Sequence, residues 1–175
     1  MSIDPDYLLK RQFSNICQSY SEKGCMLYAL GVGLEEGPLD EECFRFVIEE
    51  DLKVVPSQAV MMAHSGFWEK EDDIGIDWLK LVHAGQEIIV HKPMPTSGTV
   101  EATTRITQVS DKGERIGALI EFDRVVRNVE TGEDLCTIVT TILARGDGGC
   151  GGGRKPLRKT NLIPKTEPNF ICDMP

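Results

Sequence analysis

Hydrophobic and polar positions alternate with a period of two over four stretches in the second half of the chain, at residues 82–91, 99–109, 115–127 and 134–145. Such alternation is typical of β-strands with one buried face. The last stretch is apolar on both faces, which favours a place inside the sheet. Turn-forming sequences separate the stretches: PTSG at 95–98, DKG at 111–113 and ETGE at 130–133. We therefore predict four antiparallel strands joined by short turns.

A different pattern occupies residues 54–68, VVPSQAVMMAHSGFW, where few side chains are polar. Pro56 suits the first turn of a helix and Gly66 suits its end. A helix that is apolar nearly all round must be covered on most of its circumference, and this one is too short to span a bilayer. We predict that the sheet curves round it as a central helix. This is an α+β arrangement, the hot-dog fold.

The first half contains three further predicted elements. Asp4-Pro5 and the apolar spacing after it predict a short outer helix, and Ser19 with Glu22 has the spacing of a capping box before a second helix at 25–30. Alternation at 43–48 predicts a strand that leads into the central helix. After residue 145, Gly, basic residues and Pro replace any periodic pattern. We predict a hot-dog domain at 1–150 and a linker at 151–175.

Composition narrows the classes of function. The chain has 175 residues, enough for one domain, with 41% hydrophobic and 27% charged residues. A formal net charge of −9 argues against nucleic-acid binding, which depends on concentrated Lys and Arg. The six Cys residues include no C-x-x-C pair, so we expect reduced thiols of an intracellular protein and no metal site.

Few residue patterns indicate a reaction. His83, Glu87 and His91 share one strand face, but residues four apart on a strand are separated by about 13 Å and cannot hold one metal. His64 ends the predicted helix, where it is either a base facing a substrate tunnel or a hydrogen-bonded core histidine. The glycine-rich run at 146–153 resembles a phosphate loop only loosely, because neither Gly-Lys-Ser/Thr nor a helix follows it.

Five stretches in order resemble the N-terminal half of the MaoC-like dehydratases, the 2-enoyl-CoA hydratase 2 family. They are YSEKGCMLYALGVG at 20–33, FVIEEDLKVVP at 46–56, DWLKLVHAGQ at 77–86 with HKPMP at 91–95, DKG at 111–113, and RGDGGCGG at 145–152. Three positions depart from the family pattern: Gly24 replaces Asp, Ala84-Gly85 replaces Gly-Glu, and Cys150 replaces Phe. The resemblance covers nearly the whole chain.

The resemblance implies a double hot dog, in which two such domains, fused or paired, hydrate trans-2-enoyl-CoA to (R)-3-hydroxyacyl-CoA or run the reverse. The family's acid and base lie in an Asp-x-Asn-Pro-x-His segment of the C-terminal half, and no Asp-x-Asn occurs in this sequence. We therefore expect no catalytic residue, cofactor or metal here. The chain is expected to be the non-catalytic, acyl-CoA-binding half of a hydratase of fatty-acid metabolism. Residues 151–175 would lead to a catalytic half in the same polypeptide or a separate subunit.

What this half can supply is an apolar tunnel for the acyl chain. Each buried methylene contributes about 0.8 kcal/mol, so such a tunnel could set chain-length preference. The same side chains could instead be ordinary core. The predicted substrate-binding residues are Val60, Met61, Met62, His64, Phe67 and Trp68.

A second hypothesis remains open: a self-associating hot-dog protein that binds acyl-CoA, or a thioesterase, without hydratase chemistry. Apolar residues on the second sheet face, among them Leu119, Val125 and Val139, favour association as a homodimer or with a partner half. The resemblance implies a peroxisomal location for a eukaryotic protein and a cytoplasmic one for a bacterial protein. The linker-like end favours the first hypothesis.

Overall fold

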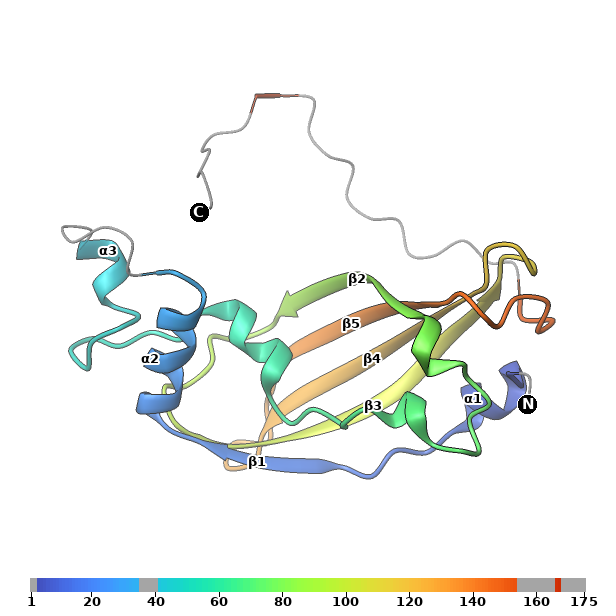
Figure 1. Cartoon of the computed structure of the whole chain (residues 1–175). Coiled ribbons are helices and arrows are strands. Elements are labelled where there is room, and N and C mark those ends of the chain that lie inside the picture. Colours follow the sequence, from blue (N-terminus) through green and yellow to red (C-terminus); the bar gives the residue numbers. More distant parts are fainter. Residues whose placement is uncertain (1–2, 35–40, 154–165, 168–175) are drawn as a thin grey trace.

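The computed structural model describes residues 3–34, 41–153 and 166–167, and its centre is one curved antiparallel sheet (Figure 1). The strand order is β1-β3-β4-β5-β2, and every neighbouring pair is antiparallel. The predicted α+β class and the four predicted strands are confirmed, and β5 lies inside the sheet as its apolar faces indicate. The strands are β1 (Ile16–Tyr20), β2 (Leu81–Val90), β3 (Gly98–Asp111), β4 (Ala118–Asn128) and β5 (Asp134–Ala144).

Short helices make up the rest of the described elements. Two predicted helices are confirmed: the Asp4 carboxylate caps the first by accepting from the backbone N–H groups of Asp6 and Tyr7. The predicted cap of the second is wrong, because Ser19 lies in β1 and the helix begins after Ser21. The α-helices are α1 (Pro5–Lys10), α2 (Glu22–Gly31) and α3 (Glu41–Phe44), and the 3₁₀ helices are η1 (Pro56–Met61), η2 (Trp68–Lys70) and η3 (Trp78–Lys80).

The predicted central helix at 54–68 is confirmed only in its first part: a helix begins at Pro56 as predicted, but it is the 3₁₀ helix η1 and it ends at Met61. No helix continues from the end of η1 to Trp68, where a second short 3₁₀ helix, η2, begins. Side chains of the sheet bind backbone groups that an α-helix would use internally: Gln18 Oε1 accepts from the Ala63 N–H at 2.6 Å, and Arg124 donates to the Val60 carbonyl. Ala63 also has a φ of 45°, which ends any helix. Residues 56–70, here called the strap, therefore cross the sheet as turns.

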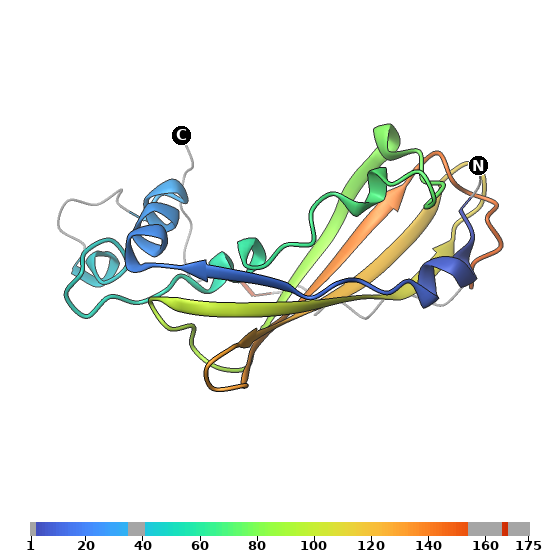
Figure 2. The ribbon, with the colours of Figure 1, turned by 90° about the horizontal axis from the view of Figure 1, so that it is seen from below.

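Figures 1 and 2 show the strap and η3 over one face of the sheet, with α2 and α3 beyond one end of it. The predicted strand at 43–48 is also wrong. Its backbone N–H groups bond locally, Phe46 to the Cys43 carbonyl and Val47 to the Phe44 carbonyl, so it forms α3 and a turn. None of the described helices is long and apolar enough to cross a membrane.

The face of the sheet under the strap carries two separate groups of buried side chains. One group joins Trp68 of the strap to Ile106, Phe122 and Ile142 of the sheet. The other joins Ala59 and Met62 of the strap to Val100, Val126 and Ile138. Between them the sheet face is more polar, and this is where the candidate site lies.

The glycine-rich run packs on the turn between β3 and β4. The Asp111 carboxylate accepts from the backbone N–H groups of Gly113, Gly149 and Gly151 at 2.8–3.0 Å. A side chain at Gly148 would meet the Gly113 carbonyl oxygen at 2.2 Å. The DKG and RGDGGCGG stretches thus form one contact. Most of the predicted linker at 151–175 lies outside the described residues, so that boundary stays a prediction.

Candidate functional site

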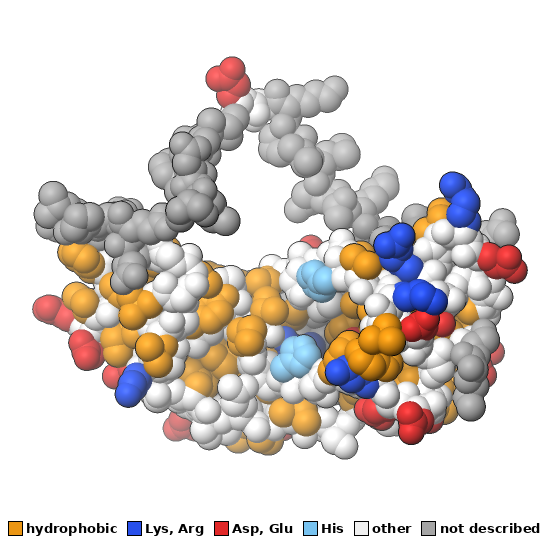
Figure 3. Space-filling model, in the orientation of Figure 1, with side chains coloured by type: hydrophobic (Ala, Val, Ile, Leu, Met, Phe, Trp, Pro, Cys, Tyr) orange, Lys and Arg blue, Asp and Glu red, His pale blue; other side chains and the backbone are white. Residues whose placement is uncertain are grey.

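A cavity of about 460 Å³ lies between the strap and the sheet, in the space separating the two buried groups. Its walls combine apolar side chains with several polar and ionisable ones, an arrangement suited to an apolar ligand that carries a polar group. Figure 3 shows two histidine side chains near the middle of this side of the molecule, with apolar side chains around them. The cavity is lined by Val60, His64, Gly66, Phe67, Glu69, His83, Gln86, Phe122, Arg124, Thr140 and Ile142.

Strand register brings the sheet part of the lining together. Phe122 of β4 pairs with Thr140 of β5, which in turn pairs with Gln86 of β2. Two residues further along β5 from Thr140, Ile142 pairs with His83. Residues paired directly across neighbouring strands point to the same face, so these side chains all face the strap. The sheet therefore fixes their positions independently of the strap.

A hydrogen-bond network fixes the polar groups of β2. The Gln86 amide donates to Thr140 Oγ1 at 3.0 Å and to the Val139 carbonyl at 3.3 Å. Its oxygen lies 3.0 Å from His83 Nε2. An amide oxygen can only accept, so His83 Nε2 carries a proton in this arrangement. Both side chains are thereby oriented in the cavity wall.

Arg124 is the buried cation of the cavity. Its side chain points to the strap face of β4, between Thr104 of β3 and Ile138 of β5 in register. It is only 4% exposed, and one guanidinium nitrogen, Nη2, donates to the Val60 carbonyl in η1. The bond ties the sheet to the strap and places a positive charge beside the cavity.

His64 is held in its neutral form. Its Nδ1 accepts from the Gly66 backbone N–H at 3.0 Å, so the single proton of the neutral ring is on Nε2. Burial and then the charge of Arg124 lower the pKa of His64 from its ordinary value. Around neutral pH His64 therefore offers one N–H donor and no positive charge.

The cause of the His64 shift can be tested by titration. We expect Arg124→Met to raise the pKa of His64 part of the way towards its ordinary value, because the charge is removed while burial remains. Imidazole chemical shifts measured by NMR against pH report the change. Arg105→Met removes an exposed charge from the other face of the sheet and is the control. An equal shift in both variants would mean that the effect comes from net charge alone.

Glu69 brings a carboxyl group into the same cavity. It belongs to η2 and is buried. Burial raises the pKa of this carboxyl, which favours its neutral form. Ionisable groups perturbed by burial in a cavity are common at functional sites, although structural sites also contain them.

The aromatic wall at the strap end is held by stacking. The Phe67 ring packs edge-on against Trp78 at 6.1 Å between centroids. The ammonium group of Lys70 lies over both rings, 4.7 Å from the centroid of Phe67 and 4.4 Å from that of Trp78. These contacts link the cavity wall to η3.

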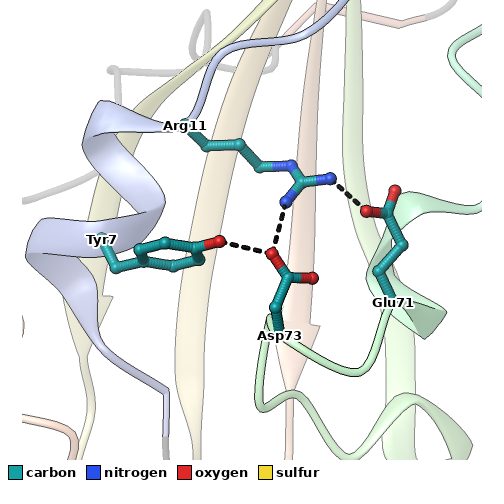
Figure 4. Close-up of polar contacts among 4 residues, drawn as sticks. All are labelled: Tyr7, Arg11, Glu71 and Asp73. Atoms are coloured by element: carbon teal, nitrogen blue, oxygen red, sulfur yellow. Dashed lines mark hydrogen bonds and ion pairs between the residues drawn. The ribbon is translucent and has the colours of Figure 1, made fainter.

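Helix α1 secures the segment that follows the strap (Figure 4). Tyr7 donates its hydroxyl proton to Asp73, and Arg11 forms ion pairs with both Asp73 and Glu71. The Arg11 guanidinium also lies 5.1 Å from the Phe13 ring centroid, and that ring packs on Trp68. The N-terminal segment therefore holds η2, and with it Glu69, against the sheet.

The six predicted substrate-binding residues do not lie together. Val60, His64 and Phe67 line the cavity. Met62 and Trp68 are buried in the two groups that flank it, and Met61 is 61% exposed. Whether any of them contacts a ligand stays a prediction.

The sequence prediction omitted most of the polar lining. One signal was available for Arg124: the core-facing positions of its strand read Ala118, Ile120, Phe122 and Val126, with a charged residue where the pattern requires an apolar one. Thr140 and Gln86 interrupt their strands in the same way. Glu69 gave no such signal, because it lies on an irregular segment whose path only the structure reveals.

The outer edge of β2 is unpaired among the described strands, since β2 is the last strand in the order. Apolar side chains border it, including Leu79, Val82 and Val90, which are all exposed. A long unpaired strand with apolar neighbours is a surface suited to pairing with another chain or domain.

Comparisons with known proteins all find hydratases and dehydratases. The family model described as the MFE-2 hydratase 2 N-terminal domain matches residues 18–146. Enoyl-CoA hydratase ChsH3 of Mycobacterium tuberculosis is 28% identical over 179 residues, which cover 100% of this chain and 61% of that relative. The chain thus spans about three fifths of the length of this curated relative.

Two solved structures give the fold. A MaoC-like dehydratase from Phytophthora capsici matches with a TM-score of 0.74 at 21% identity, over 94% of this chain and 57% of that chain. The full-length peroxisomal multifunctional enzyme type 2 of Drosophila melanogaster matches with a TM-score of 0.63 at 24% identity, over 89% of this chain and 26% of that chain. These matches confirm the predicted hot-dog fold.

Proposed function

This chain belongs to the MFE-2 hydratase 2 N-terminal domain family, within the MaoC-like hydratases and dehydratases, and from that membership we propose that it is the acyl-thioester-binding, non-catalytic half of such an enzyme. Its partner is a catalytic hot-dog half, joined through residues 151–175 or supplied as a separate subunit. The observation that carries the proposal is the cavity under the strap, which combines apolar walls with fixed hydrogen-bond donors.

The cavity supports acyl binding in two ways. Val60, Phe67, Phe122 and Ile142 offer apolar surface on which methylene groups can be buried. The Gln86 network and Arg124 hold polar groups that can orient an oxygen atom of the ligand. Hydration of an enoyl thioester also needs a positioned acid and base, which this proposal assigns to the partner half.

The unpaired edge of β2 supports association with that half. A second antiparallel sheet could continue this one through backbone hydrogen bonds, while the exposed apolar side chains beside the edge would be covered. Self-association through the same edge would instead fit the second hypothesis. The compartment is part of the proposal too: peroxisomal in a eukaryote and cytoplasmic in a bacterium.

Binding of saturated acyl-CoA thioesters tests the role of the cavity. By calorimetry we expect affinity to rise about fourfold for each added methylene until the cavity is full, which is the effect of about 0.8 kcal/mol per group. Val60→Trp places a large side chain in the wall and is expected to abolish this dependence on chain length.

Met61→Trp is the matched comparison, because Met61 adjoins Val60 in sequence but is exposed and outside the cavity lining. We expect this variant to keep the chain-length dependence. A loss in Met61→Trp with none in Val60→Trp would place the acyl chain elsewhere. Equal affinity of the unmodified protein for all chain lengths would refute acyl binding in the cavity.

A further inference from the structure

Arg124 has fewer partners than a buried guanidinium normally has. It is 4% exposed, its Nη2 donates to the Val60 carbonyl, and its Nε is buried without a hydrogen-bond partner. Among the described residues, no carboxylate forms an ion pair with it. Within the described part of the chain, it is therefore a positive charge without a counter-ion in the wall of the cavity.

The structural bond to the Val60 carbonyl accounts for only one of the five N–H groups of Arg124. Burying an ion without a counter-ion is costly, and apolar residues of similar volume commonly replace buried ionic groups without loss of stability. The neighbours of Arg124 in register, Thr104 and Ile138, carry no charge. A guanidinium instead offers a planar set of N–H donors that matches a carboxylate.

The other ionisable groups of the cavity do not neutralise Arg124. His64 is neutral and His83 is engaged with Gln86. Glu69 is the single carboxylate among the described lining residues, and it forms no ion pair with Arg124. No described residue takes the place of a counter-ion beside Arg124, so a carboxylate of a ligand can take it.

We propose that the cavity accepts an acyl chain that carries a carboxylate, with Arg124 as its specificity-determining partner. If the proposed function holds, the preferred thioester is one whose acyl group ends in a carboxylate, and this part of the inference rests on that function. The acyl chain lies along Phe67, Phe122 and Ile142, and its carboxylate accepts from the guanidinium N–H groups that do not bind Val60.

The carboxylate preference is tested first without any thioester. Calorimetry compares decanoate with methyl decanoate, which has nearly the same chain but no charge. We expect the unmodified protein to bind decanoate at least about tenfold more tightly, the effect of a charge-assisted hydrogen bond in a desolvated site. Arg124→Met is expected to abolish that preference, whereas Arg105→Met on the opposite sheet face keeps it.

Arg124→Lys is a second variant in case Arg124→Met fails to fold. It keeps the positive charge but lacks the planar set of N–H donors of arginine. We expect it to retain a reduced preference for decanoate. An unmodified protein that binds decanoate and its methyl ester equally well would overturn the proposal. So would a preference that survives in Arg124→Met.

The thioester arm compares decanoyl-CoA with 9-carboxynonanoyl-CoA. We expect the carboxylated thioester to bind more tightly, and only its affinity to fall by about tenfold or more in Arg124→Met. An equal loss for both thioesters would overturn the proposal, because it would place Arg124 on the thioester oxygen. If neither thioester binds while decanoate is still preferred, the proposed function fails and the carboxylate site stands.

Discussion

Replacing Trp68 with alanine is expected to lower the free energy of unfolding by about 3–5 kcal/mol, the usual cost of removing a large buried aromatic side chain. Trp68 is 3% exposed and packs edge-on between two rings, 5.5 Å from Phe13 and 5.6 Å from Phe122. It thus connects the N-terminal segment and the strap to the sheet. Thermal unfolding followed by circular dichroism would show the midpoint falling by roughly 6–20 °C.

Trp78→Ala is the matched control for this prediction. Trp78 follows in the same irregular region, but it is partly exposed and packs only at the edge of the cavity wall. We expect its loss to cost about 1 kcal/mol or less. Equal effects of the two substitutions would show that Trp68 does not hold the strap to the sheet.

Gly117→Ala is expected to lower the free energy of unfolding by about 2–5 kcal/mol, the sum of backbone strain and a steric clash. Gly117 has a φ of +115°, and a methyl group there would lie 2.3 Å from the carbonyl oxygen of Ala144. That oxygen belongs to the end of β5, so relief of the clash would displace the sheet itself. Urea denaturation at constant pH measures the loss.

Gly132→Ala separates strain from clash. Gly132 also has a positive φ, +69°, but no heavy atom lies within 4 Å of the added methyl group. We therefore expect a cost of about 1–2 kcal/mol from strain alone. If Gly117→Ala is no worse than Gly132→Ala, the close contact with β5 is not present in solution.

The sequence was sufficient to predict the sheet, because its signals are local. Period-two alternation and Gly-, Pro- and Asp-containing turns mark β2 to β5, and the apolar faces of β5 indicate its interior place. The strand β1 was missed. It is short, and it pairs with β3, whose first paired residue, Gly98, lies far along the chain from Tyr20, so no local pattern reveals the pairing.

The strap contains a shorter helix than predicted, for a physical reason that is also not local. Its composition suits a buried helix, but Gln18 and Arg124 compete for the backbone groups of Ala63 and Val60. Both competing side chains come from distant strands. The extent of the helix therefore depends on contacts with residues far away in the sequence.

The central claim, that this chain is a supporting half without its own hydration chemistry, is tested most directly by steady-state hydration of crotonyl-CoA and a longer enoyl-CoA. The purified chain is assayed alone, a catalytic hot-dog half carrying Asp-x-Asn-Pro-x-His is assayed alone, and the two are assayed together. We expect no turnover by this chain alone, and faster turnover of the longer substrate in the mixture than by the catalytic half alone. Val60→Trp should remove that gain. Hydration of either substrate by this chain alone would contradict the account.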